Sequence, residues 1–193
     1  MAARKVLLVA LATQTALILL SWWFARLLYL PPQWGGSARD VILGLGTALA
    51  LAAINYWLLT RAPAGWMANG VRSVYHDTIV PIFGALGPLS AITIGIAAGV
   101  GEEWFFRGII QPLAGMPVAS VLFGLAHSGS RRLLPFGVWA TGMGVVMGGL
   151  TSLTGGLAAA MLAHGVYDVL ALEYIRRTSH RPPISAERGA HTQ

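Results

Sequence analysis

The chain has 193 residues, of which 55% are hydrophobic and only 10% are charged, and it contains no cysteine. Soluble domains usually carry about 25% charged residues, so this composition excludes an ordinary water-soluble domain and indicates a protein embedded in lipid. The absence of cysteine excludes disulfides, thiolate metal ligands and cysteine nucleophiles. The formal charge is +6. Because the basic residues fall in short clusters between apolar runs, we interpret them as signals of membrane topology and expect no nucleic-acid partner.

Long apolar runs predict an all-α fold, a polytopic transmembrane bundle. A bilayer core of about 30 Å requires about 20 helical residues. Breaks at Gly115–Pro117 and Thr151–Gly156 divide the two longest stretches. Residues 66–84 have the composition of an interfacial helix. The sequence thus predicts about six membrane helices, of which the fourth is short for a full crossing: 6–30, 40–60, 87–112, 117–130, 135–152 and 156–175.

The basic residues favour one orientation of these helices. With both termini in the cytoplasm, ten of the thirteen lie on the inner side, as the positive-inside rule requires. The inner set comprises Arg4, Lys5, Arg61, Arg72, Arg131, Arg132, Arg176, Arg177, Arg181 and Arg188. We therefore expect a chain with cytoplasmic N- and C-termini in a plasma membrane, the inner membrane of a bacterium.

Five ionisable residues lie inside the apolar helices and not at their ends: Glu102, Glu103, His127, His164 and Asp168. A carboxylate at the centre of a membrane helix costs at least about 2.5–3.5 kcal/mol, so such positions are functional by default. At about 1.5 Å per residue, three of them fall at a similar depth, roughly 12–15 Å below the outer ends of their helices. This common level predicts one site, nearer to the outer face, containing Glu102, His127 and His164.

Helical spacing separates the two neighbouring glutamates. Glu103 and Arg107 are four residues apart, which predicts a neutralising ion pair and a supporting role. Glu102 faces about 100° away from Glu103 in a regular helix and remains free to face the histidines. Asp168 lies one turn after His164 on the same face of its helix.

A carboxylate with two histidines suits the activation of water. Glu102 would act as general base, His127 would position the water, and His164 with Asp168 would stabilise the oxyanion. The same Glu102, His127 and His164 would also make a plausible zinc set with an open fourth position. A third interpretation, in which the histidines only join helices, suits either histidine alone better than it suits the whole group.

Three motifs resemble those of the CPBP intramembrane proteases, the CAAX-protease and bacteriocin-processing family, also called Abi. The stretch Gly101–Gly108 reads Gly-Glu-Glu-Trp-Phe-Phe-Arg-Gly and is similar to the Glu-Glu-x-x-x-Arg motif of that family. Residues 123–127 match Phe-x-x-x-His, and residues 164–168 match His-x-x-x-Asn/Asp. The three occur in the family's order and cover about residues 85–175.

The resemblance implies a glutamic intramembrane endopeptidase with a single transmembrane domain, residues 1–177, followed by a polar cytoplasmic tail, residues 178–193. Glu102 and His127 would activate water without a cofactor, whereas zinc is the family's older alternative. His164 and Asp168 would form the oxyanion site. An ionised Asp168 cannot donate a hydrogen bond, so it is either protonated or orients His164.

The expected substrate is a membrane-anchored or lipidated protein cut near its C-terminus, of the CAAX type or carrying a C-terminal sorting signal. The expected outer position of the site favours an exported, membrane-anchored substrate. Two other classes remain. One is a non-enzymatic membrane partner of the same fold, such as an immunity protein. The other is a transporter, which the lack of an inverted repeat disfavours.

Overall fold

The computed structural model describes residues 3–179, and within that range every regular element is helical. The predicted tail therefore lies outside the described residues except for its first two positions. The elements are α1 (Ala3–Leu27), α2 (Ala38–Thr60), α3 (Trp66–Val74), the π-helix η1 (Tyr75–Ile79), α4 (Val80–Phe83), α5 (Pro88–Glu103), the π-helix η2 (Trp104–Ile110), α6 (Gln111–Ala126), the 3₁₀-helix η3 (Arg131–Leu133), α7 (Leu134–Thr154) and α8 (Ala158–Thr178). The all-helical prediction is confirmed.

Five helical segments in the described part of the chain are long and apolar enough to cross a membrane. The predicted third and fourth helices form one 39-residue segment, Pro88–Ala126. This segment bends at Gly115, whose φ of 83° and ψ of 160° are not helical and suit a residue without a Cβ. Pro117 follows the bend. The predicted break is therefore a sharp kink, after which α6 runs only from Met116 to Ala126 as a short arm.

Local sequence signals begin and end the helices around this bundle. Ser37 caps α2, because its side chain accepts from the backbone N–H of Asp40 while the Asp40 carboxylate accepts from the N–H of Ser37. Gly155 ends α7 in the left-handed conformation, with a φ of 72°. Both caps hold the turns at the end of the molecule where α2 begins and α7 ends.

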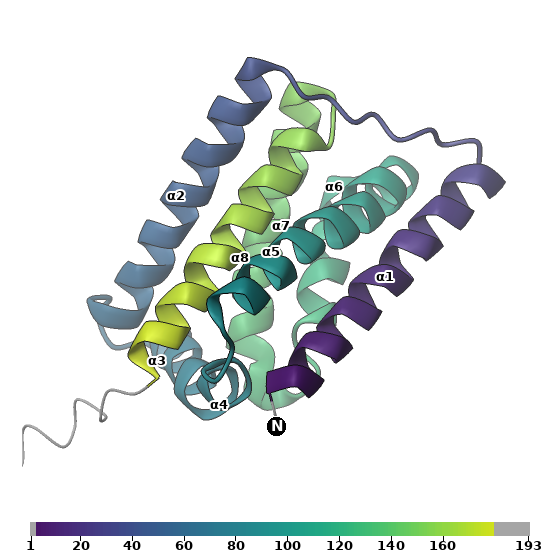
Figure 1. Ribbon diagram of the computed structural model, residues 1–193. Coiled ribbons are helices and arrows are strands. Elements are labelled where there is room, and N and C mark those ends of the chain that lie inside the picture. The colour runs from purple at the N-terminus through teal and green to yellow at the C-terminus, as the bar shows by residue number, and fades with distance from the viewer. Residues whose placement is uncertain (1–2, 180–193) are drawn as a thin grey trace, which may run out of the picture.

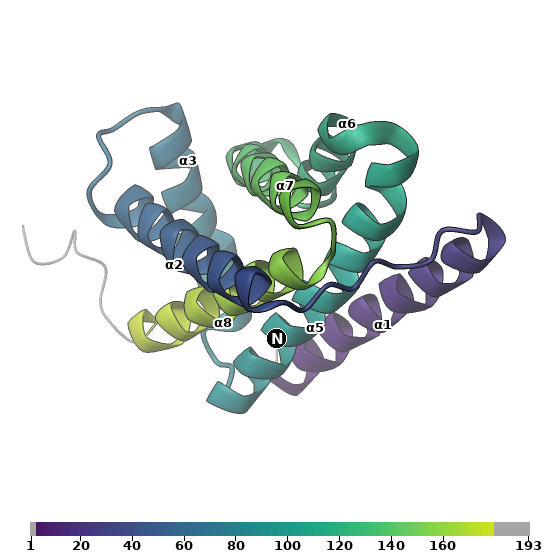
Figure 2. The ribbon, with the colours of Figure 1, turned by 90° about the horizontal axis from the view of Figure 1, so that it is seen from above.

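Glycines let the central helices approach closely. α5 packs on α8, α6 packs on α7, and α2 runs beside α8 (Figures 1 and 2). A Cβ at Gly99 would lie 2.6 Å from the backbone oxygen of Met161 and 2.8 Å from the nitrogen of Gly165. A Cβ at Gly144 would lie 3.0 Å from the Cα of Ser120. Gly99 and Gly144 thus mark close contacts between helices.

The outermost helices are α1 and α2, which lie on opposite sides of the bundle (Figure 1). The segment between them crosses over the beginning of α8. There the N–H of Leu157 donates to the carbonyl of Gln33 at 2.8 Å, and the N–H of Ala158 donates to that of Trp34 at 2.7 Å. The Trp34 ring also packs edge-on against Trp104, with centroids 5.0 Å apart. The segment between α1 and α2 thus holds the end of α1 close to η2 and to the start of α8.

The predicted interfacial helix is present as the continuous helical stretch α3, η1 and α4. Ser73 and Arg132 both donate to Asp77, at 2.8 and 2.6 Å, and these hydrogen bonds hold the pKa of Asp77 below its usual value. The hydroxyl of Tyr75 lies 2.6 Å from that of Thr178. The stretch is therefore joined to the loop before α7 and to the end of α8.

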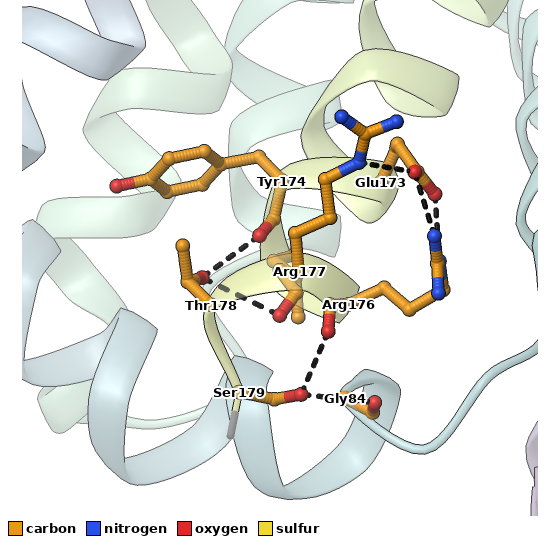
Figure 3. A network of polar contacts seen from close by, with 8 residues as sticks. Gly84, Glu173, Tyr174, Arg176, Arg177, Thr178 and Ser179 are labelled. Atoms are coloured by element: carbon orange, nitrogen blue, oxygen red, sulfur yellow. Dashed lines mark hydrogen bonds and ion pairs between the residues drawn. The ribbon is translucent and has the colours of Figure 1, made fainter. Parts of the chain in front are cut away.

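Polar contacts fix the end of α8 (Figure 3). Arg176 and Arg177 both donate to Glu173, and Ser179 donates to the carbonyl of Gly84 at 3.2 Å. The beginning of α1, the α3–α4 stretch and the end of α8 lie at the same end of the molecule (Figure 1). We call this the basic end, because it gathers the described basic residues that the sequence assigned to one side: Arg4, Lys5, Arg61, Arg72, Arg131, Arg132, Arg176 and Arg177.

Candidate functional site

A cavity of about 330 Å³ lies among the helices and brings the motif residues together. Glu102 from α5, His127 from the end of α6, and His164 and Asp168 from α8 all line it. The rest of its lining is mostly apolar and includes Ala98, Phe123, Phe136, Ala140, Met143 and Ala171. Four polar side chains from three motifs thus meet in a mostly apolar cavity, where electrostatic interactions are strong.

Glu102 and His127 face one another in this cavity. The Oε2 atom of Glu102 lies 3.8 Å from Nε2 of His127. The other ring nitrogen of His127, Nδ1, lies 2.8 Å from the carbonyl oxygen of Phe123. A carbonyl only accepts, so Nδ1 carries the proton and a neutral ring presents a lone pair at Nε2. Oε2 of Glu102 has no hydrogen-bond partner although it is buried.

Glu103 holds His164. Its Oε1 lies 2.6 Å from Nδ1 of His164, and its Oε2 lies 3.2 Å from Nε of Arg107. The side chains of Glu103 and Arg107 are fully buried. The ion pair therefore exists, but Glu103 does more than neutralise Arg107, because the same carboxylate orients one of the histidines. The two motif glutamates divide the histidines between them, whereas the sequence analysis assigned both to Glu102.

Asp168 lies on the cavity side of His164. Its Oδ2 is 3.6 Å from Nε2 of His164, and its side chain is 28% exposed. Carboxylates thus flank both ring nitrogens of His164, an arrangement that suits a ring with a proton on each nitrogen. The i, i+4 spacing on α8 places the two residues on one face, as the sequence indicates.

A π-helix sets the directions of the first-motif side chains. α5 ends at Glu103, and η2 continues it through Arg107 to Ile110. The wider turn changes the angular spacing of a regular helix at this point, and such segments are frequent at functional sites. Arg107 is only 2% exposed and donates through Nη2 to the carbonyl of Gly144 at 3.1 Å. It is thereby fixed between α5 and α7.

The Phe123 ring connects the two histidines. Its centroid lies 4.6 Å from that of His127 and 5.7 Å from that of His164. The guanidinium of Arg107 lies 4.6 Å from the same ring, in a cation–π contact. The second motif therefore contributes Phe123, which packs between the two histidine rings, as well as His127.

Gln14 of α1 is a site residue that the sequence analysis missed. Its Nε2 donates to Oε1 of Glu102 at 2.7 Å, and it lines the cavity. The available signal was a single amide in the first apolar run. Because the Gln14 amide carries no charge, the pattern of ionisable residues in the sequence does not include it.

The cavity extends toward the basic end. Its lining continues along α8 to Leu172 and Ile175, and it includes Val71, Tyr75, Ile79 and Phe83 from the α3–α4 stretch. The depth estimate placed the site nearer the opposite end of the bundle, and it stays a prediction. His127 follows the C-terminus of α6, beside the loop that carries Arg131 and Arg132.

Among residues 3–179, no three or more His, Cys, Asp and Glu side chains are grouped so as to hold a metal ion. In the predicted zinc set of Glu102, His127 and His164, Nδ1 of each histidine contacts another partner, so that Nε2 would be the ligand atom of each ring.

Comparison with known proteins identifies the part of the chain that carries this site. The chain matches no curated protein and no solved structure in these comparisons. Residues 83–170 match the family described as type II CAAX prenyl endopeptidase Rce1-like. The match spans all three motifs, from the end of α4 into α8. Residues 83–170 are thus similar to the Rce1-like family of CAAX proteases, in agreement with the motifs that the sequence analysis singled out.

Proposed function

We propose that this protein is an intramembrane endopeptidase that hydrolyses a peptide bond of a membrane-associated protein with water activated by Glu102 and His127. One observation carries the proposal. The buried Oε2 of Glu102 has no hydrogen-bond partner and lies 3.8 Å from Nε2 of His127. Two acceptors aimed at one point suit a water molecule that donates to both.

In the proposed reaction, Glu102 takes a proton from this water as the oxygen attacks the carbonyl carbon of the substrate. The C=O bond opens to an oxyanion. Glu102 then returns the proton to the amide nitrogen as the C–N bond breaks, which releases an amine and a carboxylic acid. His127, fixed through Phe123, keeps the water in line throughout.

The proposed oxyanion donor is the Nε2–H of His164. Glu103 accepts from Nδ1 of the ring and so holds its other nitrogen toward the cavity, beside Asp168. We assign Asp168 the role of orienting His164 by charge, because its Oδ2 lies 3.6 Å from Nε2, beyond hydrogen-bond distance, and attracts a protonated ring while Nε2–H stays available to the oxyanion. Donors held in place before the reaction are usually the largest source of rate acceleration.

The substrate class follows from the shape of the cavity and the family. The apolar lining reaches the basic end, which the positive-inside rule places in the cytoplasm. A lipidated C-terminal peptide would enter there with its lipid along the apolar wall and its scissile bond beside Glu102. We therefore favour a CAAX-type substrate, and this replaces the preference for an exported substrate that rested on the expected outer position.

The test uses the purified chain in liposomes and two internally quenched peptides. One is farnesylated and ends in a CAAX-type sequence, and the other is anchored by an apolar C-terminal helix without a lipid. We expect cleavage of the farnesylated peptide and its loss in Glu102→Gln. Glu173→Gln is the matched control, because Glu173 is engaged with Arg176 and Arg177 and does not line the cavity.

The outcomes separate the alternatives. Cleavage of the lipid-free peptide alone would favour sorting-signal processing. Wild-type rates in both Glu102→Gln and His127→Ala would favour a non-enzymatic partner. Activity that disappears on chelation and returns with one equivalent of zinc would favour the zinc version, whereas full activity of metal-free protein would exclude it.

A further inference from the structure

We infer that Gln14 is a positioning residue for the general base, so that α1 completes the site although it lies outside residues 83–170. The inference rests on the proposed function, because it concerns how Glu102 is held for its task. The hydrogen bond from Gln14 Nε2 to Oε1 of Glu102 fixes the carboxylate with Oε2 toward His127.

The geometry supports an oriented carboxylate. Glu102 has two oxygens, and each has a different environment. Gln14 donates to one at 2.7 Å, and the other has no partner and faces the histidine. Without the donor, either oxygen would face His127, and the side chain would turn freely about its last torsion, which is broad for a carboxylate. A single amide therefore selects the catalytic oxygen.

The position of Gln14 is costly for a purely structural residue. α1 has only three buried residues, and Gln14 is one of them at 7% exposure. Its own Oε1 is buried without a partner, which costs free energy in an apolar environment. An apolar residue of the same length would avoid that cost and still pack against α5. Retaining the amide is explained by its bond to Glu102.

Gly101 permits the contact. A Cβ at this position would lie 2.6 Å from Oε1 of Gln14 and 3.1 Å from its backbone oxygen. The absence of a side chain next to Glu102 thus lets α1 come close enough for Gln14 to reach the carboxylate. The close approach of α1 to α5 at Gly101 and the hydrogen bond from the Gln14 amide to Glu102 therefore depend on each other.

The test measures kcat, KM and melting temperature of Gln14→Met in liposomes, with the peptide that the wild-type chain cleaves. Met keeps the length of the side chain and removes the donor. We expect kcat to fall about ten- to one-hundred-fold, the range for a hydrogen bond to a charged group. KM and the melting temperature should stay close to wild type. Gln14→Glu, which places a second carboxyl group against Glu102, should be slower than Gln14→Met.

Thr13→Leu is the matched control, because Thr13 is an exposed polar residue on the same helix and does not line the cavity. It should leave kcat unchanged. Wild-type kcat in Gln14→Met, or a loss of activity matched by a loss of folding, would overturn the inference. If Glu102→Gln is inactive while Gln14→Met is fully active, only this inference fails. If Glu102→Gln is active, or the wild-type chain cleaves neither peptide, the proposed function fails as well.

Discussion

The buried pair of Glu103 and Arg107 makes the sharpest prediction about stability. Both side chains are fully buried, with Oε2 of Glu103 3.2 Å from Nε of Arg107. In Arg107→Met, the carboxylate keeps only His164 as a partner, and the carbonyl of Gly144 loses its donor. Packing changes little, because the two side chains have similar length. The loss of stability in Arg107→Met therefore measures the cost of leaving the Glu103 carboxylate buried without its arginine.

Removing one partner of a buried ion pair costs about 3–5 kcal/mol. For a chain of this size, 1 kcal/mol corresponds to about 2–4 °C, so the melting temperature of Arg107→Met should fall by roughly 6–20 °C. The double variant Glu103→Gln with Arg107→Met removes both charges of this ion pair. It should recover more than half of that loss and remain inactive, because Glu103 no longer orients His164.

Thermal unfolding in detergent, followed by the fluorescence of the seven tryptophans, measures both effects. Arg39→Met, at an exposed position, is the matched control and should stay within about 0.5 kcal/mol of wild type. A melting temperature of Arg107→Met equal to that of the control would refute the reasoning. So would a double variant whose loss equals the sum of the two single losses.

Three further changes test the packing, the basic end and the cavity. Gly99→Ala should destabilise the chain by about 1–3 kcal/mol in the same unfolding assay, because its Cβ meets the backbone of α8, whereas Gly142→Ala, with open space around it, should not. Folding lowers the pKa of Asp77 below its usual value of 3.8. The ion pair between Asp77 and Arg132 therefore contributes fully to stability at pH values above 3.8, and this contribution is lost as the pH falls through the lower pKa of the folded state. Arg132→Gln should therefore lower the melting temperature at neutral pH and have no effect below that pKa. Ala171→Trp should fill the lipid path, raising KM for the farnesylated peptide without loss of stability, and an unchanged KM would contradict the assigned path.

The sequence predicted the ionisable residues that meet in the candidate cavity, because a charged residue in an apolar helix is conspicuous. Glu102, His127, His164 and Asp168 come from three distant runs, and one cavity contains them all. The bond from Glu103 to His164 was not predictable, because it depends on a π-helix and on how α5 packs against α8. Regular helical spacing gives the direction of a side chain only where the helix is regular.

The missed features depend on long-range packing. Gln14 is uncharged, and nothing in its own run indicates that Gly101 lets α1 approach Glu102. The break at Gly115 and the short helix after it were both predicted. The extension of the cavity to the α3–α4 stretch at the basic end was not, because it depends on how segments distant in the sequence pack together.

The central claim is that the chain hydrolyses peptide bonds of membrane proteins through Glu102. Its most direct test compares the termini of all membrane proteins in cells that produce the wild-type chain or Glu102→Gln at equal levels. We predict a set of C-terminally shortened proteins that is present with the wild-type chain and absent with the variant. An identical set of termini in the two membranes would contradict the account.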